Sequence, residues 1–546
     1  MNKLFLPNFR SKLQQLKKVQ NLTLSFVSGL LLWMSWPVSS LTFLIFFAFI
    51  PLLLLADTVA KRSSFGFYVF LSFFIWNIGT TWWLWNSTEV GAIAAFMVNG
   101  VLMSFIWVGY FLIKRRFGKN IGYAALISFW MLFEYIHLNW ELTWPWLTIG
   151  NVFATKTGWI QWYEYTGVSG GTLWVLLVNI LMYEFLFSEK KINQKISKVV
   201  PLVALIIIPL GISWLLGNKV KSYNKERQLS SKNILIVQPD IDPYQKFESN
   251  NISQDIQKLV SLSEQNTDSS TQLVVWPETA LAAGIVIDDI QKEEVYRLVF
   301  DYVKRHPNLT LLTGIETYKV YGKEKVTSSA RRGMDGNYYD ALNAAITIKA
   351  NEPIQLYTKS KLVPGVETLP SFLNFMAPLF EQFGGTTGGY ARDTAAAAFK
   401  ISNTPYIAAP IICYESIYGE YVTQYVQKGA NLLTIITNDG WWDNTPGHRQ
   451  HLQYARLRAI ETRKYVVRSA NTGISAVIDN AGHIKETRKW DETSVIKCTV
   501  PAIPGETFYV RYGDYLYKIF SVLALLIIGW NVFFFVKDRY RKIKST

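Results

Sequence analysis

The sequence consists of long apolar stretches at both ends and a central segment with strand and helix patterning. Apolar runs of about 20 residues, the length that crosses a bilayer as a helix, occur before residue 217 and again after residue 515. The first run, 22–57, is too long for one crossing and is interrupted near Pro37, so it predicts a tight helical hairpin. In all, the pattern predicts about eight membrane-spanning helices, the other six at 66–87, 91–113, 120–138, 166–188, 200–217 and 515–536.

Basic residues between the apolar runs predict the orientation of these helices. They cluster at 61–62, 114–119 and 190–198 and in the tail 537–544, all on the side of the N-terminus in the expected topology. The single basic residue in the opposite connections, 37–40, 87–91 and 139–166, is Lys156. Positive charge favours the cytoplasmic face, so both termini are expected there and 218–514 is expected outside the cytoplasm.

The central segment predicts an α/β domain of layered sheets and helices. Short β-branched runs alternate with amphipathic stretches at 251–265, 291–305 and 447–464, which fit helices covering a sheet. The expected strands are 234–237, 273–276, 310–313, 344–348, 407–413, 432–437 and 475–478. We therefore expect a membrane domain at 1–217, an α/β domain at 218–514 and a final helix with a basic tail at 515–546. Within the α/β domain, the apolar segment 369–383 and the glycine-rich 384–389 fit either a mobile lid or a disordered surface loop.

Composition narrows the classes of protein. Hydrophobic residues make up 50% of the chain and aromatic residues 15%, which is apolar for a soluble protein of this size. The net charge of +15 comes from short clusters between apolar runs and not from one basic face, and no nucleic-acid-binding motif occurs. Only Cys413 and Cys498 are present, which excludes a disulfide framework and a CxxC metal pattern but leaves one possible bridge between them.

Candidate catalytic residues occur in three stretches of the expected α/β domain. Glu278 lies just past 273–276, and Cys413 ends the buried run 407–413. Lys359 and Glu367 belong to a turn-rich loop. Taken singly, each has an ordinary explanation: a surface carboxylate, a solvated lysine, a small buried cysteine. Their positions at strand ends of one α/β domain favour catalysis instead.

Glu, Lys and Cys together suit acyl transfer through a thiol. A cysteine with a pKa of about 8.5 is mostly protonated at neutral pH, so it needs a base or a cation nearby. Glu278 can take the thiol proton and return it to the leaving group. Lys359 can stabilise the negative oxygen of the tetrahedral intermediate.

The motifs that contain these residues are similar to those of a known superfamily. WPETA at 276–280, then YTKSKLVP at 357–364 with Glu367 eight residues after the lysine, then ICYE at 412–415 resemble the nitrilase, or carbon–nitrogen hydrolase, superfamily. That resemblance implies a four-layer αββα fold and a Glu-Lys-Cys triad. With the expected membrane helices, the whole chain resembles the bacterial apolipoprotein N-acyltransferase family.

The resemblance implies roles for individual positions. Glu278 corresponds to the general base, Lys359 to the oxyanion-stabilising lysine and Cys413 to the nucleophile. The supporting or substrate-binding positions are Glu367, Tyr414, Glu415, Trp146, Asn438 and Trp441. The sequence departs from the family pattern at Thr143, where glycine is common, at Phe247, where tryptophan is common, and at 364–368, and these differences concern substrate contacts more than chemistry.

The implied reaction is N-acylation of the diacylglyceryl-cysteine at the N-terminus of an apolipoprotein, by a ping-pong mechanism through a thioester on Cys413. The acyl donor is expected to be a phospholipid such as phosphatidylethanolamine, attacked at its sn-1 ester. No cofactor and no metal are expected. The expected location is the bacterial inner membrane, with the catalytic domain on the periplasmic side.

Two other interpretations fit parts of the sequence. A membrane-anchored amidase or nitrilase would keep the triad but use water as the acceptor. A scaffold or transporter would need charged residues inside the spans, where Glu134 and Glu184 are the notable ones. His448 and His451 lack zinc-site spacing, so we expect them to have structural roles or to be polar residues of the pocket. We expect ion pairs for Arg456, Arg458 and Glu461, and no reaction at Cys498.

Overall fold

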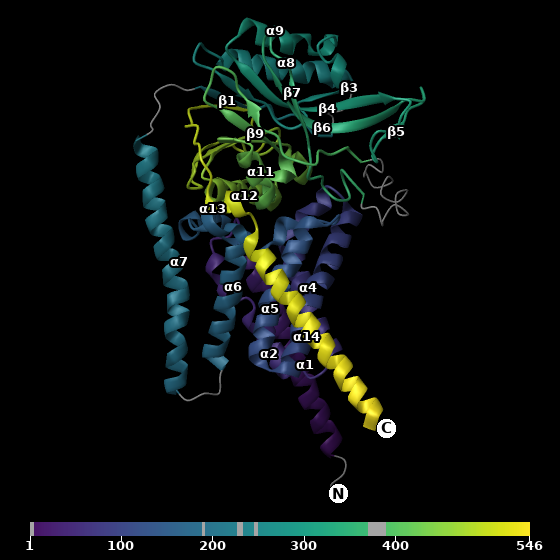
Figure 1. The fold of residues 1–546 in the computed structure, drawn as a ribbon, viewed down its shortest axis with the longest axis vertical. Coiled ribbons are helices and arrows are strands. Elements are labelled where there is room, and N and C mark those ends of the chain that lie inside the picture. Colours follow the sequence, from purple (N-terminus) through teal and green to yellow (C-terminus); the bar gives the residue numbers. More distant parts are fainter. Residues whose placement is uncertain (1–4, 188–191, 227–232, 245–248, 370–388, 546) are drawn as a thin grey trace.

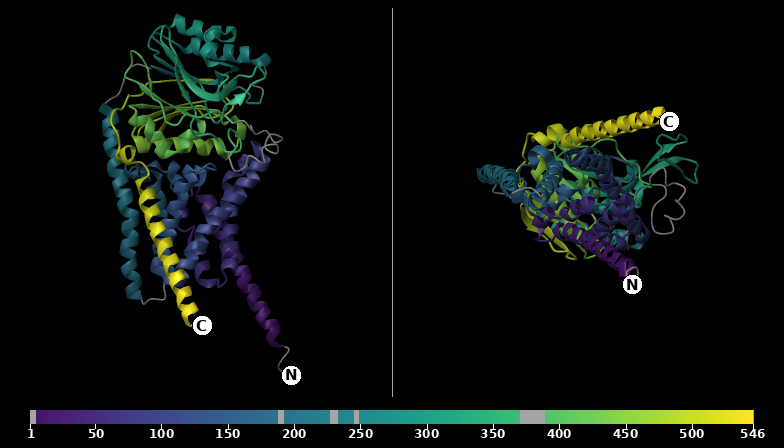
Figure 2. Two further views of the ribbon diagram at one scale, coloured as in Figure 1. Left: turned by 45° about the vertical axis from the view of Figure 1, so that its right-hand side comes forward. Right: turned by 90° about the horizontal axis from the view of Figure 1, so that it is seen from below.

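The computed structural model describes residues 5–187, 192–226, 233–244, 249–369 and 389–545. A part built on two β-sheets stands over the ends of a group of long helices, and both termini lie at the far end of those helices (Figures 1 and 2). Phe247 and nearly all of the expected lid at 369–389 lie outside the described residues.

The helical part is formed by helices between residues 5 and 226 and by the last helix of the chain. Thr88 caps α4 by accepting a hydrogen bond from the Gly91 N–H, and Gly118, at φ 87°, joins α4 directly to α5. The helices of this part are α1 (Phe5–Ser35), α2 (Ile50–Thr58), α3 (Arg62–Thr81), α4 (Glu89–Phe117), α5 (Lys119–Asn139), α6 (Tyr163–Phe187), α7 (Ile192–Glu226) and α14 (Tyr515–Ser545). Short 3₁₀ turns connect them: η1 (Thr42–Phe46), η2 (Trp82–Asn86), η3 (Pro145–Leu147), η4 (Ile149–Thr155) and η5 (Thr157–Trp159).

Six helices in the described part of the chain are long and apolar enough to cross a membrane, fewer than the eight expected. The difference lies in 22–57. Helix α1 ends at Ser35, close to the break predicted near Pro37, but its N-terminal half contains Lys17, Lys18 and other polar residues. The expected second arm folds as η1 and α2, and this segment, Thr42–Thr58, is shorter than a span.

Two mixed sheets form the other part. The first has the order β14-β1-β2-β4-β6-β5, with β3 paired to β4 and β7 to β6, and the second has the order β13-β12-β11-β10-β9-β8. The first contains β1 (Ile234–Gln238), β2 (Leu273–Val275), β3 (Leu281–Val286), β4 (Thr310–Gly322), β5 (Arg331–Arg332), β6 (Tyr338–Ile348), β7 (Gln355–Thr358) and β14 (Ser494–Cys498). The second contains β8 (Phe399–Lys400), β9 (Ile407–Ile412), β10 (Leu432–Thr437), β11 (Tyr465–Ala470), β12 (Ala476–Ile478) and β13 (Ile484–Thr487). All seven predicted strands are present, some longer than expected.

The layers stack as helices, sheet, sheet, helices, which confirms the expected αββα fold (Figure 1). The side chains of β1, which point alternately to the two faces of the sheet, explain why both faces are covered. Ile234 and Ile236 pack in the core between the sheets, whereas Leu235 and Val237 pack under the outer helices. The outer helices are α8 (Ser249–Asn266) and α9 (Arg297–Arg305), with the 3₁₀ turns η6 (Ile287–Asp289) and η7 (Glu294–Tyr296) nearby. Facing the membrane part are α11 (Gly419–Gln427), α12 (Pro446–Thr462) and α13 (Phe508–Tyr512), with the turns η9 (Cys413–Ile417) and η10 (Asp439–Trp442).

Candidate active site

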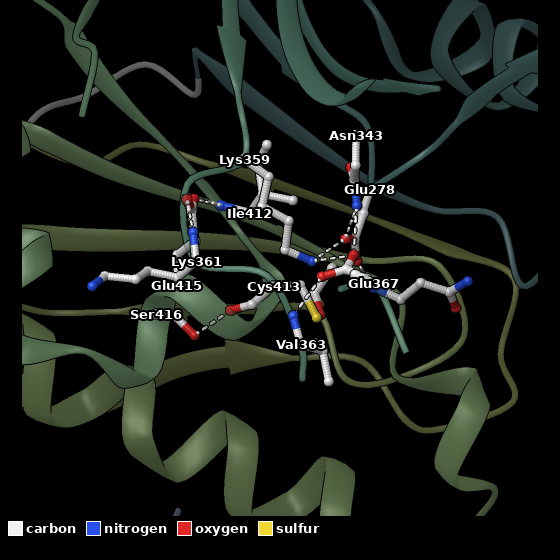
Figure 3. A network of polar contacts seen from close by, with 12 residues as sticks. Glu278, Asn343, Lys359, Lys361, Val363, Glu367, Ile412, Cys413, Glu415 and Ser416 are labelled. Atoms are coloured by element: carbon white, nitrogen blue, oxygen red, sulfur yellow. Dashed lines mark hydrogen bonds and ion pairs between the residues drawn. The ribbon is translucent and has the colours of Figure 1, made fainter. Parts of the chain in front are cut away.

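Glu278, Lys359 and Cys413 meet at one point although they come from both sheets (Figure 3). Glu278 follows β2, Lys359 follows β7 and Cys413 follows β9. The Lys359 Nζ atom lies 3.0 Å from Glu278 Oε1, and the thiol of Cys413 is hydrogen-bonded to the Glu278 carboxylate. All three side chains are buried. Because each follows a strand end, the sheets themselves fix the geometry of the group.

The carboxylate of Glu367 and the amide of Asn343 complete the group of side chains around Glu278 and Lys359. Lys359 Nζ lies 2.8 Å from Glu367 Oε1, so the ammonium group contacts two carboxylates. Asn343 on β6 donates to Glu278 Oε1 at 2.9 Å and to Glu367 Oε1 at 3.0 Å. The backbone N–H of Asn438 donates to Glu278 Oε2 at 3.1 Å. Asn343 lies inside a strand with no recognisable motif around it, which is why the sequence did not indicate its role.

The charges of this group favour an ionised Glu278 and a protonated thiol. Burial opposes ionisation of Glu278, but the Lys359 charge and the hydrogen bonds from Asn343 and Lys359 outweigh it and hold the pKa of Glu278 below its usual range. Burial also opposes the charge on Lys359, yet Glu278 and Glu367 raise its pKa well above the ordinary value. Burial and the negative charge of Glu278 raise the pKa of the Cys413 thiol well above its ordinary value. The resting pair is therefore a carboxylate and a thiol.

Glu415 connects the loop of Lys359 to the turn of Cys413. Its Oε2 accepts from the Ile412 N–H at 2.9 Å, and its Oε1 accepts from the Ser360 N–H at 2.7 Å and the Tyr357 hydroxyl at 2.5 Å. Burial raises the pKa of Glu415, and these donors oppose the shift. Glu415 therefore positions both loops and does not face the reacting group.

The backbone of Cys413 has a φ of 47°, a left-handed conformation that non-glycine residues rarely adopt. Its carbonyl oxygen is held by the Ser416 hydroxyl at 2.8 Å and lies 3.2 Å from His451 Nε2. His451 Nδ1 lies 2.9 Å from Asp439 Oδ1, and Arg468 donates to Asp439 Oδ2 at 2.6 Å. The sequence predicted a structural role for His451, but not this network, because Asp439 and Arg468 come from different elements.

Cys413, Asp439 and His451 also offer ligand atoms that lie within 4.8 Å of one another, a set that can hold a metal ion. The guanidinium group of Arg468 already provides a positive charge there. It is 2.6 Å from Asp439 and 3.1 Å from the Nδ1 atom of His451. Burial opposes ionisation of Asp439, but Arg468 and His451 hold its pKa below the usual range. The carboxylate is thus neutralised by the protein's own arginine.

A largely apolar cavity of about 220 Å³ opens between the helical part and the sheets, and Cys413 and Tyr414 belong to its wall. Much of the remaining wall is aromatic or aliphatic, with residues from η2, α4, the end of α5 and the loop after Lys359. Among these residues are Trp83, Leu84, Val98, Trp140, Trp144, Trp146, Val363, Val366 and Trp442. Such a wall suits a hydrocarbon chain.

The expected supporting residues occupy different places around this cavity. Trp146 lines it and donates through Nε1 to Gln450 at 2.6 Å. Tyr414 lines it and donates to the Thr143 carbonyl oxygen at 3.0 Å. Trp441 is not part of this wall and packs against Tyr244 with ring centroids 5.3 Å apart, whereas its neighbour Trp442 lines the cavity. The departure at Thr143 has a structural use, because its hydroxyl accepts from Tyr418 at 2.7 Å.

The other candidates from the sequence are placed elsewhere. Arg458 and Glu461 form a fully buried ion pair at 2.7 Å, as expected, whereas Arg456 donates to the Gly482 carbonyl oxygen. His448 packs against the ring of Trp490. Cys413 and Cys498 are not joined by a disulfide. Glu134 and Glu184 have partners within the helical part, among them Thr172 and Tyr517 for Glu134 and Lys119 and Tyr123 for Glu184.

Comparisons with known proteins indicate the family of the chain. A family model described as carbon–nitrogen hydrolase matches residues 236–502, and a model described as apolipoprotein N-acyltransferase N-terminal domain matches 28–181. The apolipoprotein N-acyltransferase of Chlorobaculum tepidum is 30% identical and aligns with 90% of this chain and 92% of its own length. Those of Geobacter metallireducens and Thermotoga maritima are 26% and 25% identical, covering 90% and 95% of this chain and 91% and 95% of their own. A solved carbon–nitrogen hydrolase superfamily protein from Xanthomonas campestris aligns with 50% of this chain and 92% of its own at 15% identity and a TM-score of 0.34.

The two sheets and their flanking helices thus form a carbon–nitrogen hydrolase domain, here carried by a helical membrane part. Relatives align over nearly the full length of both parts. The chain belongs to the apolipoprotein N-acyltransferase family, and it is an acyltransferase with several candidate membrane spans.

Proposed function

We propose that this protein transfers an acyl chain from a phospholipid, such as phosphatidylethanolamine, to the α-amino group of the diacylglyceryl-cysteine of an apolipoprotein. One observation carries the proposal: Cys413, hydrogen-bonded to Glu278 and close to Lys359, lies in the wall of an apolar cavity that faces the membrane helices. Hydrolysis of small amides would not require an apolar cavity there. Two lipid substrates would, because their chains can enter without crossing water.

In the first half-reaction, Cys413 attacks the carbonyl carbon of the sn-1 ester. Glu278 takes the thiol proton as the sulfur–carbon bond forms, and Lys359 stabilises the negative carbonyl oxygen. The carbon–oxygen bond to glycerol then breaks, and the alkoxide takes the proton from Glu278. The products are a thioester on Cys413 and a lysophospholipid.

The resting protonation states indicate when the proton moves. The pKa of Glu278 is lowered and the pKa of the Cys413 thiol is raised, so a free thiolate is unfavourable in the resting enzyme. Proton transfer is therefore coupled to attack on the ester, when the negative charge passes on to the oxygen next to Lys359.

In the second half-reaction, the neutral α-amino group attacks the thioester carbon. Glu278 accepts a proton from the nitrogen, Lys359 again faces the negative oxygen, and the carbon–sulfur bond breaks. The thiolate regains its proton from Glu278. An amide is formed and the enzyme returns to its starting state.

Charge distribution supports a periplasmic position for the catalytic domain, which we propose to be 218–514. The basic residues at the end of α4 and in the last turn of α14 lie at helix ends remote from the sheets (Figure 1). If those ends are cytoplasmic, as the positive-inside rule favours, the sheets lie outside in the inner membrane of a bacterium.

The test uses purified protein reconstituted with phosphatidylethanolamine. Mass spectrometry of the intact protein and its peptides is expected to find one acyl group on Cys413, which disappears when a diacylglyceryl-cysteine peptide is added and becomes N-acylated. Cys413→Ala is expected to abolish both steps, whereas Cys498→Ala, the matched control at the other cysteine, is expected to retain them. An adduct on another residue, or release of fatty acid to water at the same rate without the peptide, would contradict the proposal.

A further inference from the structure

Two hydrogen-bond donors in the cavity wall have no partner within the described residues. They are His137 Nε2, near the end of α5, and Trp144 Nε1, in the loop that leads to η3. The side chain of His137 is 8% exposed, and the Trp144 nitrogen is itself buried. Both residues line the cavity that contains Cys413. A buried donor without an acceptor is unfavourable, so this pair points to a ligand.

The tautomer of His137 follows from its neighbour. The indole N–H of Trp140 lies 3.0 Å from His137 Nδ1, and an indole nitrogen can only donate. His137 Nδ1 must therefore be an acceptor, so the ring is neutral and its single proton is on Nε2. The unpartnered atoms of His137 and Trp144 are thus both N–H donors.

The two residues lie close to each other. The backbone N–H of Trp144 bonds to the carbonyl oxygen of His137 at 3.4 Å, and both side chains also border a small hollow of about 10 Å³ beside the main cavity. That hollow is about large enough for one oxygen atom of a ligand or one water molecule. Because both unpartnered atoms are hydrogen-bond donors, the group that fills this hollow should be an acceptor.

We propose that His137 and Trp144 bind the carbonyl oxygen of an ester that Cys413 does not attack, in one of the two glycerolipid substrates. A carbonyl oxygen accepts two hydrogen bonds and has no proton to place, which matches two donors. This inference rests on the proposed function, since it assigns a second contact for the same lipids. The ester belongs either to the sn-2 chain of the phospholipid or to the diacylglyceryl group of the acceptor.

A water molecule is the rival occupant. It would accept from the same two donors and would need acceptors for its own protons, and Asn99 Oδ1, another unpartnered atom on the cavity wall, could take one of them. The Asn99 amide donates to Asn77 Oδ1 at 2.7 Å, which fixes its oxygen as the free end. A water would make the site indifferent to lipid esters.

The experiment compares esters with ethers in the full-length protein. In the donor arm, the initial rate of acyl-Cys413 formation is measured with a diacyl phosphatidylethanolamine and with the same lipid carrying an ether at sn-2. In the acceptor arm, preformed acyl-enzyme is mixed with a diacylglyceryl-cysteine peptide or with its dialkyl analogue. The variants are Trp144→Phe, which keeps the aromatic surface, and His137→Leu. Trp83→Phe is the control, because the indole N–H of Trp83 already donates to the Thr80 carbonyl oxygen.

In either the donor arm or the acceptor arm, the wild-type protein is expected to react faster with the ester than with the ether. The expected ratio of the two rates is about 3- to 10-fold for each of the two hydrogen-bond donors. Trp144→Phe and His137→Leu should each remove their share of that preference, so that the rate with the ester falls further than the rate with the ether, whereas Trp83→Phe should change both rates by one factor. Equal rates with ester and ether in both arms of the wild type, or equal losses with both lipids in Trp144→Phe, would overturn the inference. Absence of any acyl-Cys413 in the wild type would instead overturn the proposed function.

Discussion

His451 contacts the main chain of Cys413: its Nε2 atom lies 3.2 Å from the carbonyl oxygen of that residue. The contact matters because Cys413 has a φ of 47°, a conformation that costs about 1–2 kcal/mol for a residue with a side chain. Asp439 and Arg468 support His451 from behind, and all three side chains are fully buried. The network therefore orients Cys413, the proposed nucleophile, through its backbone.

We expect Asp439→Asn to slow acylation of Cys413 by about 10- to 100-fold, the effect typical of a displaced reacting group, with little change in the KM for phospholipid. The amide removes the charge that holds His451 and Arg468. His451→Gln should retain more activity than His451→Ala, because a glutamine amide can still donate to the Cys413 carbonyl oxygen. Rates are measured from the burst of acyl-enzyme.

The control for this network is Asp443→Asn, since Asp443 is an exposed residue just beyond the same turn. It should behave as wild type. A change in KM with constant kcat in Asp439→Asn, or identical activity of the Gln and Ala variants at His451, would argue for a purely structural role.

A second prediction compares two lysines of one loop. Lys359→Met should lower the acylation rate by about 10²- to 10³-fold, the usual effect of losing one oxyanion donor. Lys361→Met should have a much smaller effect, because the Lys361 Nζ atom stacks over the rings of Tyr418 and Tyr421 at 5.1 and 5.4 Å. Single-turnover kinetics with phospholipid distinguish the two. Comparable losses in both variants would show that general positive charge, and not the position of Lys359, is what matters.

The sequence indicated the three candidate catalytic residues because each lies in a short local motif, and two of them lie at the end of an expected strand. Cys413 ends a run of buried residues, and Glu278 follows Trp276 and Pro277 at the end of another. Some of the side chains that support them could not be predicted in this way. Asn343, for example, lies on β6, and Glu278 follows β2. Their contact depends on the strand order β2-β4-β6. Such contacts depend on strand order, which no local pattern contains.

Strands that contain a charged residue within an apolar run were also not predicted from the sequence. Strand β11 contains Arg468 inside an otherwise apolar run, and the buried partners of that arginine explain why it is tolerated there. The turn η10 places Trp442 in the cavity wall, of which Trp441 is not part, and a contact between Trp441 and substrate stays a prediction. Apolar composition alone overestimated the spans at 22–57, where the second arm is too short to cross.

A third prediction concerns pH. The Cys413 thiol has a raised pKa, from burial first and then from the charge of Glu278, so alkylation by iodoacetamide should be slow at pH 7–8 and rise only above pH 9. Glu278 has a lowered pKa and must be ionised to act as a base. Acylation should therefore persist as the pH falls to the usual carboxyl range, about 4.5, and be lost only below it. A cysteine peptide is the alkylation control, and fast alkylation of Cys413 at pH 7 would indicate a preformed thiolate.

The last prediction tests the carboxylate that joins the two catalytic loops. Glu415 accepts backbone N–H groups on both oxygens, from Ile412 on one and from Ser360 on the other. In Glu415→Gln, either orientation of the amide places its NH₂ group against a buried N–H, which leaves a donor unsatisfied at a cost of about 1–3 kcal/mol. The variant should unfold several degrees lower in detergent and acylate Cys413 more slowly, because Lys359 and Cys413 lose their common anchor.

Glu352→Gln is the matched change at a partly exposed carboxylate on the surface, where Glu352 contacts Lys349 and Ser402. It should lower the unfolding temperature less than Glu415→Gln does, since water can reach the partly exposed side chain of Glu352. Thermal unfolding and the acylation burst are measured on the same samples. If Glu415→Gln keeps both the unfolding temperature and the burst rate of the wild type, the two loops are held in place by other contacts, and the buried carboxylate is not needed to align Lys359 with Cys413.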